Sequence, residues 1–144
     1  MINENLYKHF ETETISKVNR FEIRKKDLNE LKKSFQNKII LISGAAGSIG
    51  SQFSKDIFKY NFKIKKIIFL DKDENMLTEL NRELLLFKNF RKINIDFVCS
   101  DLNSMDISDF LLKNKVQFYL NFAAIKHVRS EENIQSIKYM FKTN

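Results

Sequence analysis

The sequence of 144 residues contains no proline, no tryptophan, one cysteine, two histidines and three glycines. The single cysteine, Cys99, excludes an internal disulfide and a zinc site built from several cysteines. Apolar runs such as Lys38–Ser43 have the length of a strand and are far shorter than the ~18 residues that indicate a membrane span. Met1–Glu11 lacks the basic start and apolar stretch of a secretory signal peptide. These absences favour a cytoplasmic protein without a membrane span.

Charge of one sign is in excess, because 25 Lys and Arg residues face 18 Asp and Glu residues and the net charge is +7. The basic residues are scattered, acids stand between most of them, and no nucleic-acid-binding motif accompanies them. We therefore expect a solvated basic surface and no nucleic-acid partner. The hydrophobic share of 43% is enough for one packed domain.

Residues 1–36 are polar and predict an N-terminal helical extension that ends in one amphipathic helix through Leu28, Leu31 and Phe35. Residues 37–144 read differently, as a Rossmann-type domain in which buried strands alternate with helices. The predicted strands are Lys38–Ser43, Lys66–Asp71, Ile93–Asp101 and Val116–Ala124.

The helices between these strands follow from apolar residues at helical spacing. Ile49, Phe53 and Ile57 mark the first of these helices, and Leu77, Leu80, Leu84 and Phe87, after a cap at Asp73, mark the second. In the third, which covers Met105–Lys113, Phe110 and Leu111 face inward. The last helix carries Ile134, Ile137 and Phe141 after a cap at Ser130. The alternation predicts the α/β class, a doubly wound parallel sheet of about four strands in the order 3-2-1-4.

All three glycines fall in one window, Ser43-Gly-Ala-Ala-Gly-Ser-Ile-Gly50, between the first strand and the first helix of the domain. Gly44 allows a tight turn off the strand, Gly47 removes a side chain where backbone approaches a pyrophosphate, and Gly50 lets the helix pack close to the sheet. The free N–H groups and the dipole of the helix favour phosphate. The window predicts a dinucleotide site; a glycine-rich turn that merely connects strand and helix is the alternative.

Acidic residues end the next two strands. Asp71 is placed to accept hydrogen bonds from the adenosine ribose, which favours NAD, whereas Lys72 is placed to pair with the 2′-phosphate of NADP or to be an ordinary exposed lysine. The cofactor is therefore NADP or NAD. Asp101 is placed either to meet the adenine edge or to cap the next turn. We expect Cys99 to be a small buried hydrophobe and His9 to be inert.

The glycine spacing resembles the extended short-chain dehydrogenase/reductase superfamily. Within it, three stretches resemble the capsular-polysaccharide (CapD-like) nucleoside-diphosphate-sugar dehydratases, which are similar to UDP-N-acetylglucosamine 4,6-dehydratases. They are Asn37–Ser51, Ile68–Leu77, and Phe122-Ala-Ala-Ile-Lys-His-Val128 followed by Glu131–Asn133 and Ile137–Asn144. The resemblance implies a reaction in which hydride leaves sugar C4 for the nicotinamide, water is eliminated across C5 and C6, and hydride returns to C6.

The resemblance also implies site residues. The pyrophosphate would be lined by Gly44, Ala46, Gly47, Ser48, Ile49 and Gly50, the adenosine ribose by Asp71 and Lys72, the adenine by Asp101 and Leu102, and the nicotinamide-side ribose by Ala123 and Ala124. Lys126 and His127 would reach the active-site crevice, although a packed loop histidine is an equal alternative for His127.

The chain departs from the family pattern in three ways. Asn121 stands where the family usually has His, and Arg129 replaces a Pro. The family's Tyr-x-x-x-Lys pair has no counterpart, because Tyr7, Tyr60, Tyr119 and Tyr139 are followed four residues later by Glu11, Ile64, Ala123 and Thr143. Without that pair hydride transfer has no acid/base partner, so no catalytic residue and no metal ligand is assigned.

We therefore expect the cofactor-binding half of a sugar-nucleotide 4,6-dehydratase in surface-glycan biosynthesis, truncated before its catalytic and sugar-binding part and inactive alone. A UDP-sugar would bind only if the missing lobe is supplied, and the exposed fourth strand favours self-association or a complementing chain. The alternatives are part of a sugar-nucleotide 4-epimerase, a dinucleotide-binding module without chemistry, and a basic nucleic-acid-binding protein.

Overall fold

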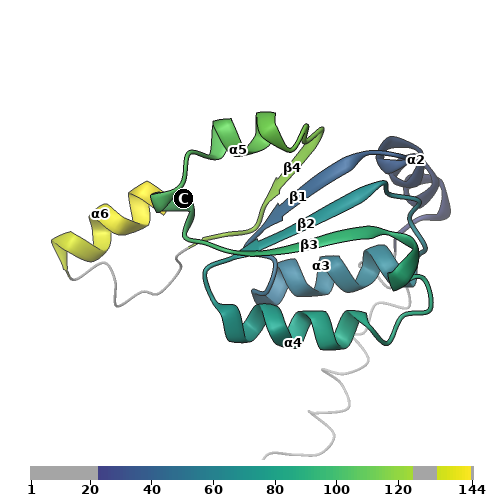
Figure 1. Ribbon diagram of the computed structural model, residues 1–144, viewed down its shortest axis with the longest axis horizontal. Coiled ribbons are helices and arrows are strands. Elements are labelled where there is room, and N and C mark those ends of the chain that lie inside the picture. The colour runs from purple at the N-terminus through teal and green to yellow at the C-terminus, as the bar shows by residue number, and fades with distance from the viewer. Residues whose placement is uncertain (1–22, 125–132, 144) are drawn as a thin grey trace, which may run out of the picture. The chain divides into compact units, whose positions relative to one another are not determined.

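The computed structural model describes residues 23–124 and 133–143 (Figure 1). The chain forms two compact units, Met1–Leu31 and Lys32–Asn144. Helix α2 (Lys25–Phe35) begins in the described part of the first unit. There the Arg24 guanidinium pairs with the Asp27 carboxylate at 2.7 Å. Interpretations of His9, Lys126, His127, Arg129 and Ser130 concern positions outside the described residues.

The second unit contains a four-stranded parallel sheet in the order β3-β2-β1-β4, which confirms the predicted topology. The central strands β1 and β2 are runs of Ile, Leu and Phe that are buried on both faces. Such runs are typical of parallel strands covered by helices on two sides. The strands are β1 (Ile39–Ser43), β2 (Lys66–Asp71), β3 (Asn94–Cys99) and β4 (Phe118–Asn121).

Helices α3 (Ser48–Lys59) and α4 (Glu74–Leu84) lie together on one side of the sheet (Figure 1). The predicted apolar stripe of α4 is confirmed, since Leu77, Leu80 and Leu84 are buried. Asp73 caps this helix, as predicted, by accepting a hydrogen bond from the Met76 N–H at 3.0 Å. This side of the sheet therefore has a fully buried core.

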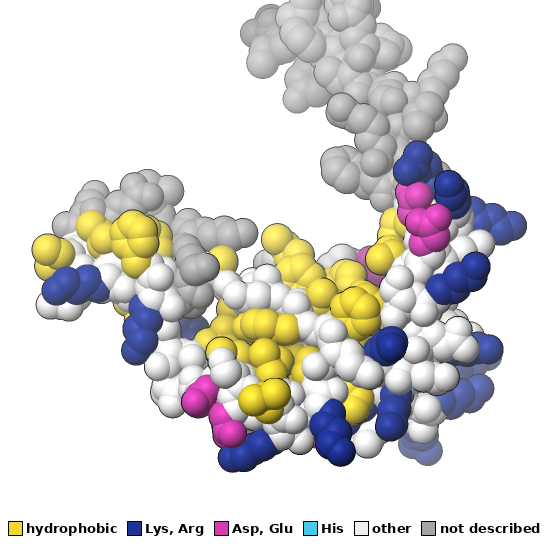
Figure 2. All heavy atoms as spheres, turned by 90° about the horizontal axis from the view of Figure 1, so that it is seen from above, with side chains coloured by type: hydrophobic (Ala, Val, Ile, Leu, Met, Phe, Trp, Pro, Cys, Tyr) yellow, Lys and Arg dark blue, Asp and Glu magenta, His cyan; other side chains and the backbone are white. Residues whose placement is uncertain are grey.

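The opposite side of the sheet carries helix α5 (Ile107–Lys113) (Figure 1). Leu41, Ile68 and Leu70 are fully buried there, but the side chains that cover them are only partly buried. These covering side chains are Val98, Leu102, Met105, Ile107, Phe110, Leu111 and Val116. The inward orientation predicted for Phe110 and Leu111 is thereby confirmed. Seen from above, hydrophobic side chains gather in the middle of the molecular surface, and Lys and Arg side chains border them (Figure 2).

Helix α6 (Ile134–Thr143) lies in the second described range, residues 133–143. Asn133 stands at its start and accepts a hydrogen bond from the Gln135 N–H at 2.8 Å. Two of the three apolar residues that predicted this helix, Ile134 and Phe141, are exposed. Their side chains therefore do not form a buried stripe.

Several predicted boundaries were too long. β3 ends at Cys99 rather than Asp101, β4 is confined to Phe118–Asn121, and α4 ends at Leu84. Helix α5 begins at Ile107 instead of Met105, because the Asp106 carboxylate caps it by accepting from the Asp109 N–H. Phe87 lies beyond α4, and its ring centroid is 6.0 Å from that of Phe58.

Two predictions about side-chain burial were wrong. Ile49 does not belong to the apolar face of α3, because it occupies the first turn of that helix and is 58% exposed. Cys99 is exposed rather than buried, since it ends an edge strand of the sheet. Among the described residues, no helix has the length and apolar character that crossing a membrane requires.

Truncating a side chain at the centre of the sheet should lower the free energy of unfolding. Ile68 is fully buried in the cluster with Leu41 and Leu70, so Ile68→Ala should cost about 2–5 kcal/mol through lost burial and the cavity left behind. Urea unfolding followed by circular dichroism measures the change. The control is Leu86→Ala, because Leu86 is 84% exposed and should change stability by no more than about 0.5 kcal/mol. Equal losses in both variants would contradict this description of the core.

Candidate functional site

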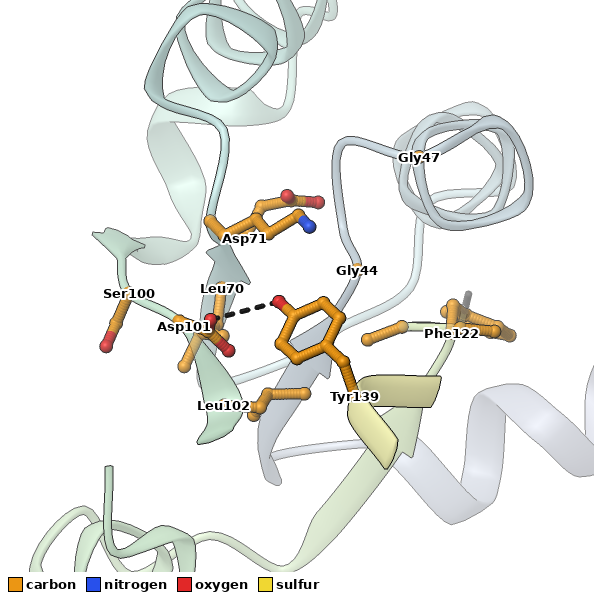
Figure 3. Close-up of a pocket in the computed structure, with 12 residues that line it drawn as sticks. Gly44, Gly47, Leu70, Asp71, Ser100, Asp101, Leu102, Phe122 and Tyr139 are labelled. Atoms are coloured by element: carbon orange, nitrogen blue, oxygen red, sulfur yellow. Dashed lines mark hydrogen bonds between the residues drawn. The ribbon is translucent and has the colours of Figure 1, made fainter. Parts of the chain in front are cut away.

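A cavity of about 190 Å³ lies at the carboxyl ends of the strands. At this point the strand order reverses, because β1 has β2 as its neighbour on one side and β4 on the other. Parallel sheets of this order bind ligands at such a switch point. Eight of the predicted site residues line the cavity: Gly44, Gly47, Asp71, Lys72, Asp101, Leu102, Ala123 and Ala124 (Figure 3). Ala46, Ser48, Ile49 and Gly50 stand in the same loop and helix start but do not line it.

Gly44 is required by the fold itself. Its φ of +64° lies in the left-handed region, which residues with a side chain rarely adopt. A Cβ at this position would also lie 2.4 Å from the Ala123 N and 2.6 Å from the Phe122 carbonyl carbon. The end of β1 and the segment after β4 therefore approach each other with no room for a side chain.

Gly50 is the second glycine that the fold requires. A Cβ there would lie 2.1 Å from the Gly44 carbonyl oxygen and 2.9 Å from the Ala45 Cα. This contact explains how the start of α3 packs so closely against the end of β1, as the sequence predicted for Gly50.

Gly47 differs from the other two glycines. A Cβ at Gly47 would meet only the Gly44 carbonyl oxygen, at 3.3 Å, and the φ of Gly47 is −67°. A small shift of the loop would accommodate that atom. The fold therefore tolerates a side chain at Gly47, and the absence of one leaves the cavity wall bare at that point.

The N-terminus of α3 is not neutralised by a side chain. No side-chain hydrogen bond caps it at Gly47, and its first turn contains no acidic residue. By contrast, α4 and α5 each begin with an aspartate cap and carry an acid in the first turn. The N–H groups and the positive dipole end of α3 are thus available to an anion.

Asp71 supports the loop that follows β1. One oxygen of its carboxylate accepts a hydrogen bond from the Ala46 N–H at 3.0 Å, and the other accepts from the Asp73 N–H at 3.2 Å. The Ala45 N–H donates to the Leu70 carbonyl oxygen at 3.2 Å and adds a second link between loop and strand. Asp71 therefore lines the cavity and also fixes the backbone that encloses it, a role that its position in the sequence did not predict.

Asp101 makes the capping contact that the sequence offered as one of two alternatives, and it lines the cavity as well. Its Oδ1 accepts from the Asn103 N–H at 2.8 Å, at the start of a short 3₁₀ turn, Leu102–Ser104. This backbone hydrogen bond lowers the pKa of Asp101 below its ordinary value of 3.8, and a hydrogen bond from Tyr139 and the charge of Lys72 act in the same direction. Asp101 is thus a carboxylate at neutral pH.

Tyr139 of α6 lines the cavity although the sequence gave no reason to expect it. Its hydroxyl donates to Asp101 Oδ2 at 3.1 Å, and the Lys72 Nζ lies 5.6 Å from the centre of its ring (Figure 3). The only signal in the sequence is its position on a helix whose place relative to the sheet could not be predicted. Leu70, Ser100 and Phe122 also line the cavity and were not predicted to.

Asn121, which stands where the family usually has His, has a structural role. Its Oδ1 accepts from the buried Ser43 hydroxyl at 2.7 Å and from the Ala123 N–H at 3.0 Å. The side chain thereby holds the end of β4 and the following turn against the end of β1, beside the close contact at Gly44. Among the described residues, no group of three or more His, Cys, Asp or Glu side chains is placed to hold a metal ion.

A profile of the family described as "Polysaccharide biosynthesis protein" matches residues 40–144, which include all of the sheet except Ile39, the glycine loop and every described residue of the cavity. The chain belongs to this family. The capsular polysaccharide biosynthesis protein CapD of Staphylococcus aureus is 30% identical over 102 residues, which are 71% of this chain and 17% of CapD. The resemblance to CapD-like proteins is thus confirmed. The chain spans only that small share of its curated relative.

Solved structures support the fold of this polysaccharide biosynthesis family member. A UDP-glucuronic acid 4-epimerase from Bacillus cereus, in complex with UDP-glucuronic acid and NAD, is 24% identical with a TM-score of 0.53, covering 73% of this chain and 32% of the epimerase. Pen from Bacillus thuringiensis is 23% identical with a TM-score of 0.57, covering 76% of this chain and 30% of Pen. A short chain dehydrogenase from Mycobacterium smegmatis is 16% identical with a TM-score of 0.56, covering 76% and 47%. These similarities confirm the Rossmann-type architecture.

Alanine at each glycine of the loop should separate the fold's requirements from those of a ligand. Gly50→Ala should lower the free energy of unfolding by about 1–3 kcal/mol or more, because its Cβ collides with backbone, and Gly44→Ala should cost at least as much because φ is positive. Gly47→Ala should cost less than about 1 kcal/mol. Thermal and urea unfolding of the three variants measure these differences. A loss at Gly47 as large as that at Gly50 would contradict this ranking.

Proposed function

We propose that this chain binds a nicotinamide dinucleotide and forms the cofactor-binding part of a nucleoside-diphosphate-sugar 4,6-dehydratase in polysaccharide biosynthesis. The observation that carries the proposal is the cavity at the switch point of the sheet, where a bare glycine loop and an uncapped helix stand beside two carboxylates. Of the alternatives, a basic nucleic-acid-binding protein does not use this combination, whereas a sugar-nucleotide 4-epimerase and a dinucleotide-binding module without chemistry would use it as well.

The arrangement matches the parts of a dinucleotide in order. A pyrophosphate fits at the start of α3, where Gly47 leaves the wall bare and the helix offers N–H groups to negative charge. The carboxylate of Asp71 stands where two ribose hydroxyls would donate to it. Asp101 and Leu102 lie farther along the same crevice, on the side of β3, and would meet the adenine. Ala123 and Ala124 would face the nicotinamide half.

When bound, a nicotinamide dinucleotide supplies a hydride acceptor and donor. This chain's own residues would hold and orient it: the loop and α3 fix the phosphates, Asp71 orients the ribose, and the contact of Gly44 with Ala123 sets the depth of the crevice. No described residue is assigned to move a proton from a sugar substrate. Catalysis on a UDP-sugar is therefore proposed for the complete enzyme, with further residues supplied from outside the cavity described.

The choice of a 4,6-dehydratase rests on the stretches that resemble CapD-like enzymes and on the match to CapD. A sugar-nucleotide 4-epimerase is the second candidate, because the fold also matches a UDP-glucuronic acid 4-epimerase with NAD bound. Both activities use the same dinucleotide, so the cofactor proposal does not depend on the choice between them. Incubating the complete enzyme with UDP-N-acetylglucosamine separates the two, since only a dehydratase releases a 4-keto-6-deoxy sugar.

Calorimetric titration of the chain with NAD⁺ and NADP⁺ tests the cofactor proposal. We expect binding of both nucleotides, with NAD⁺ the tighter because the carboxylate of Asp71 repels a 2′-phosphate. Gly47→Asp should weaken binding by more than about tenfold, or about 1.4 kcal/mol, because it places a side chain and a negative charge against the pyrophosphate. Gly47→Ala should show a smaller loss, and Leu86→Ala should bind as the unaltered chain does. Tighter binding of NADP⁺, abolished by Lys72→Gln, would instead assign Lys72 to the 2′-phosphate.

Two results would contradict the proposal. The first is the absence of heat and of any stabilisation by either nucleotide in a chain that unfolds cooperatively. The second is binding that Gly47→Asp leaves unchanged, because the nucleotide would then occupy a different surface.

We also propose that a second protein chain, in the first place another copy of this one, covers the α5 side of the sheet. The cluster there is only partly buried, Leu112 of α5 is 78% exposed, and β4 is an edge strand. Exposed apolar side chains beside an unpaired strand edge favour association.

Association should depend on concentration and on Leu112. Light scattering after size exclusion should give a mass above 17.1 kDa that falls toward the monomer on dilution, and Leu112→Lys should shift the chain to monomer at concentrations where the unaltered chain associates. Leu86→Lys is the matched control, because Leu86 is equally exposed but follows α4 on the other side of the sheet. A monomer at every concentration, or equal effects of the two substitutions, would contradict the proposal.

A further inference from the structure

Tyr139 forms part of the cavity wall, and its ring projects over the crevice. Figure 3 shows its ring over the crevice, between the ends of β2 and β3 on one side and Phe122 on the other, with its hydroxyl directed at Asp101. It reaches this position from α6, which is far along the chain from Leu70 and Asp71, the residues of β2 that line the cavity. The ring therefore occupies space at the end of the crevice where Asp101 and Leu102 are placed to meet a base.

The contacts of Tyr139 have the chemistry of a bound adenine. Adenine is a flat aromatic ring with a hydrogen-bond donor, its amino group, on its edge. Tyr139 presents a flat aromatic ring with a donor on its edge, and that donor is 3.1 Å from the carboxylate oxygen of Asp101. The Lys72 Nζ, 5.6 Å from the ring centre, lies over its face as a cation lies over an aromatic system. A nucleotide base and Tyr139 would compete for the same groups.

Helix α6 buries little apolar surface. Its Ile134 and Phe141 side chains are 67% and 79% exposed, and Ile137 and Met140 are half-buried, so displacement of the helix would return no fully buried apolar side chain among these four to water. The Asp101 carboxylate would exchange one donor, the Tyr139 hydroxyl, for another, the amino group of the base, and would keep a hydrogen-bond partner throughout.

We propose that Tyr139 is an internal substitute for the adenine base: it occupies the base end of the crevice in the unliganded chain, and a dinucleotide binds by displacing it. The inference rests on the proposed function, because the ligand it invokes is the same dinucleotide. Its consequence is quantitative. The apparent dissociation constant equals the intrinsic constant divided by the fraction of molecules in which Tyr139 has left the site. Removing the ring should therefore tighten binding.

The test compares three variants of the whole chain by calorimetry with NAD⁺, AMP and nicotinamide mononucleotide. Tyr139→Ala should tighten NAD⁺ and AMP several-fold and leave nicotinamide mononucleotide unchanged, because only the adenine half competes with the ring. Tyr139→Phe keeps the ring but lacks the hydrogen bond to Asp101, so it should show a smaller gain. Phe141→Ala is the matched control, since it removes another exposed aromatic ring from the same helix and should change none of the three affinities.

The outcomes distinguish this inference from the proposed function. If the unaltered chain binds NAD⁺ and Tyr139→Ala binds it equally or more weakly, the competition is refuted and the dinucleotide site stands. A weaker Tyr139→Ala would mean that the base stacks on the ring. If Tyr139→Ala binds NAD⁺ and the unaltered chain does not, the competition is supported, and the missing heat of the unaltered chain then no longer counts against the dinucleotide site, because the ring of Tyr139 blocked it. If neither binds while both unfold cooperatively, both proposals fail, because opening the crevice has then exposed no nucleotide site. Tyr139→Phe gives the same decision if Tyr139→Ala does not fold.

Discussion

The structure depends on one contact from which side chains are excluded. The end of β1, the start of α3 and the segment after β4 meet within the distance of a Cβ at Gly44 and Gly50. A side chain at either position would separate the strand from the helix or from the turn. The cavity owes its shape to this contact, because the three segments that form its floor are held together there. The hydrogen bonds of Asn121 to Ser43 and Ala123 and of Asp71 to Ala46 then fix the segments on either side.

The two faces of the sheet differ in how completely their apolar side chains are buried. Where α3 and α4 lie, apolar side chains are buried completely, whereas the seven-residue helix α5 leaves its own core cluster partly exposed. A short helix covers little of a four-stranded sheet, and β4 has a strand on one side only. The side that remains partly uncovered is the side on which we propose that a second chain adds buried surface. The side with α3 and α4 is thus packed more completely than the side with α5.

The sheet and the glycine loop were predictable because strong local patterns carry them. Continuous Ile, Leu and Phe runs identify β1 and β2, and Gly44 and Gly50 stand at positions where geometry admits little else. Element ends were less predictable, since local capping decides them: Asp106 starts α5 two residues later than hydrophobic spacing suggested. Ile49 was misplaced because the periodicity was extended into the first turn of α3, where this side chain is 58% exposed. Tyr139 and the support given by Asp71 were missed because both are contacts between segments distant in the chain, and spacing contains no information about such contacts.

The pairing of β4 with β1 joins segments that are far apart in the chain. Asp71 reaches its partner in the loop across 25 residues, while Ser43 and Asn121 meet across 78. Closing the longer loop costs about 1 kcal/mol more in chain entropy, and contacts of high sequence separation slow folding. We therefore expect β1, β2 and β3 to pair before β4 completes the sheet. Since the crevice is lined both by β2 and by the segment after β4, it is complete only when β4 has paired, and a ligand that binds there would stabilise the finished sheet over a three-stranded form.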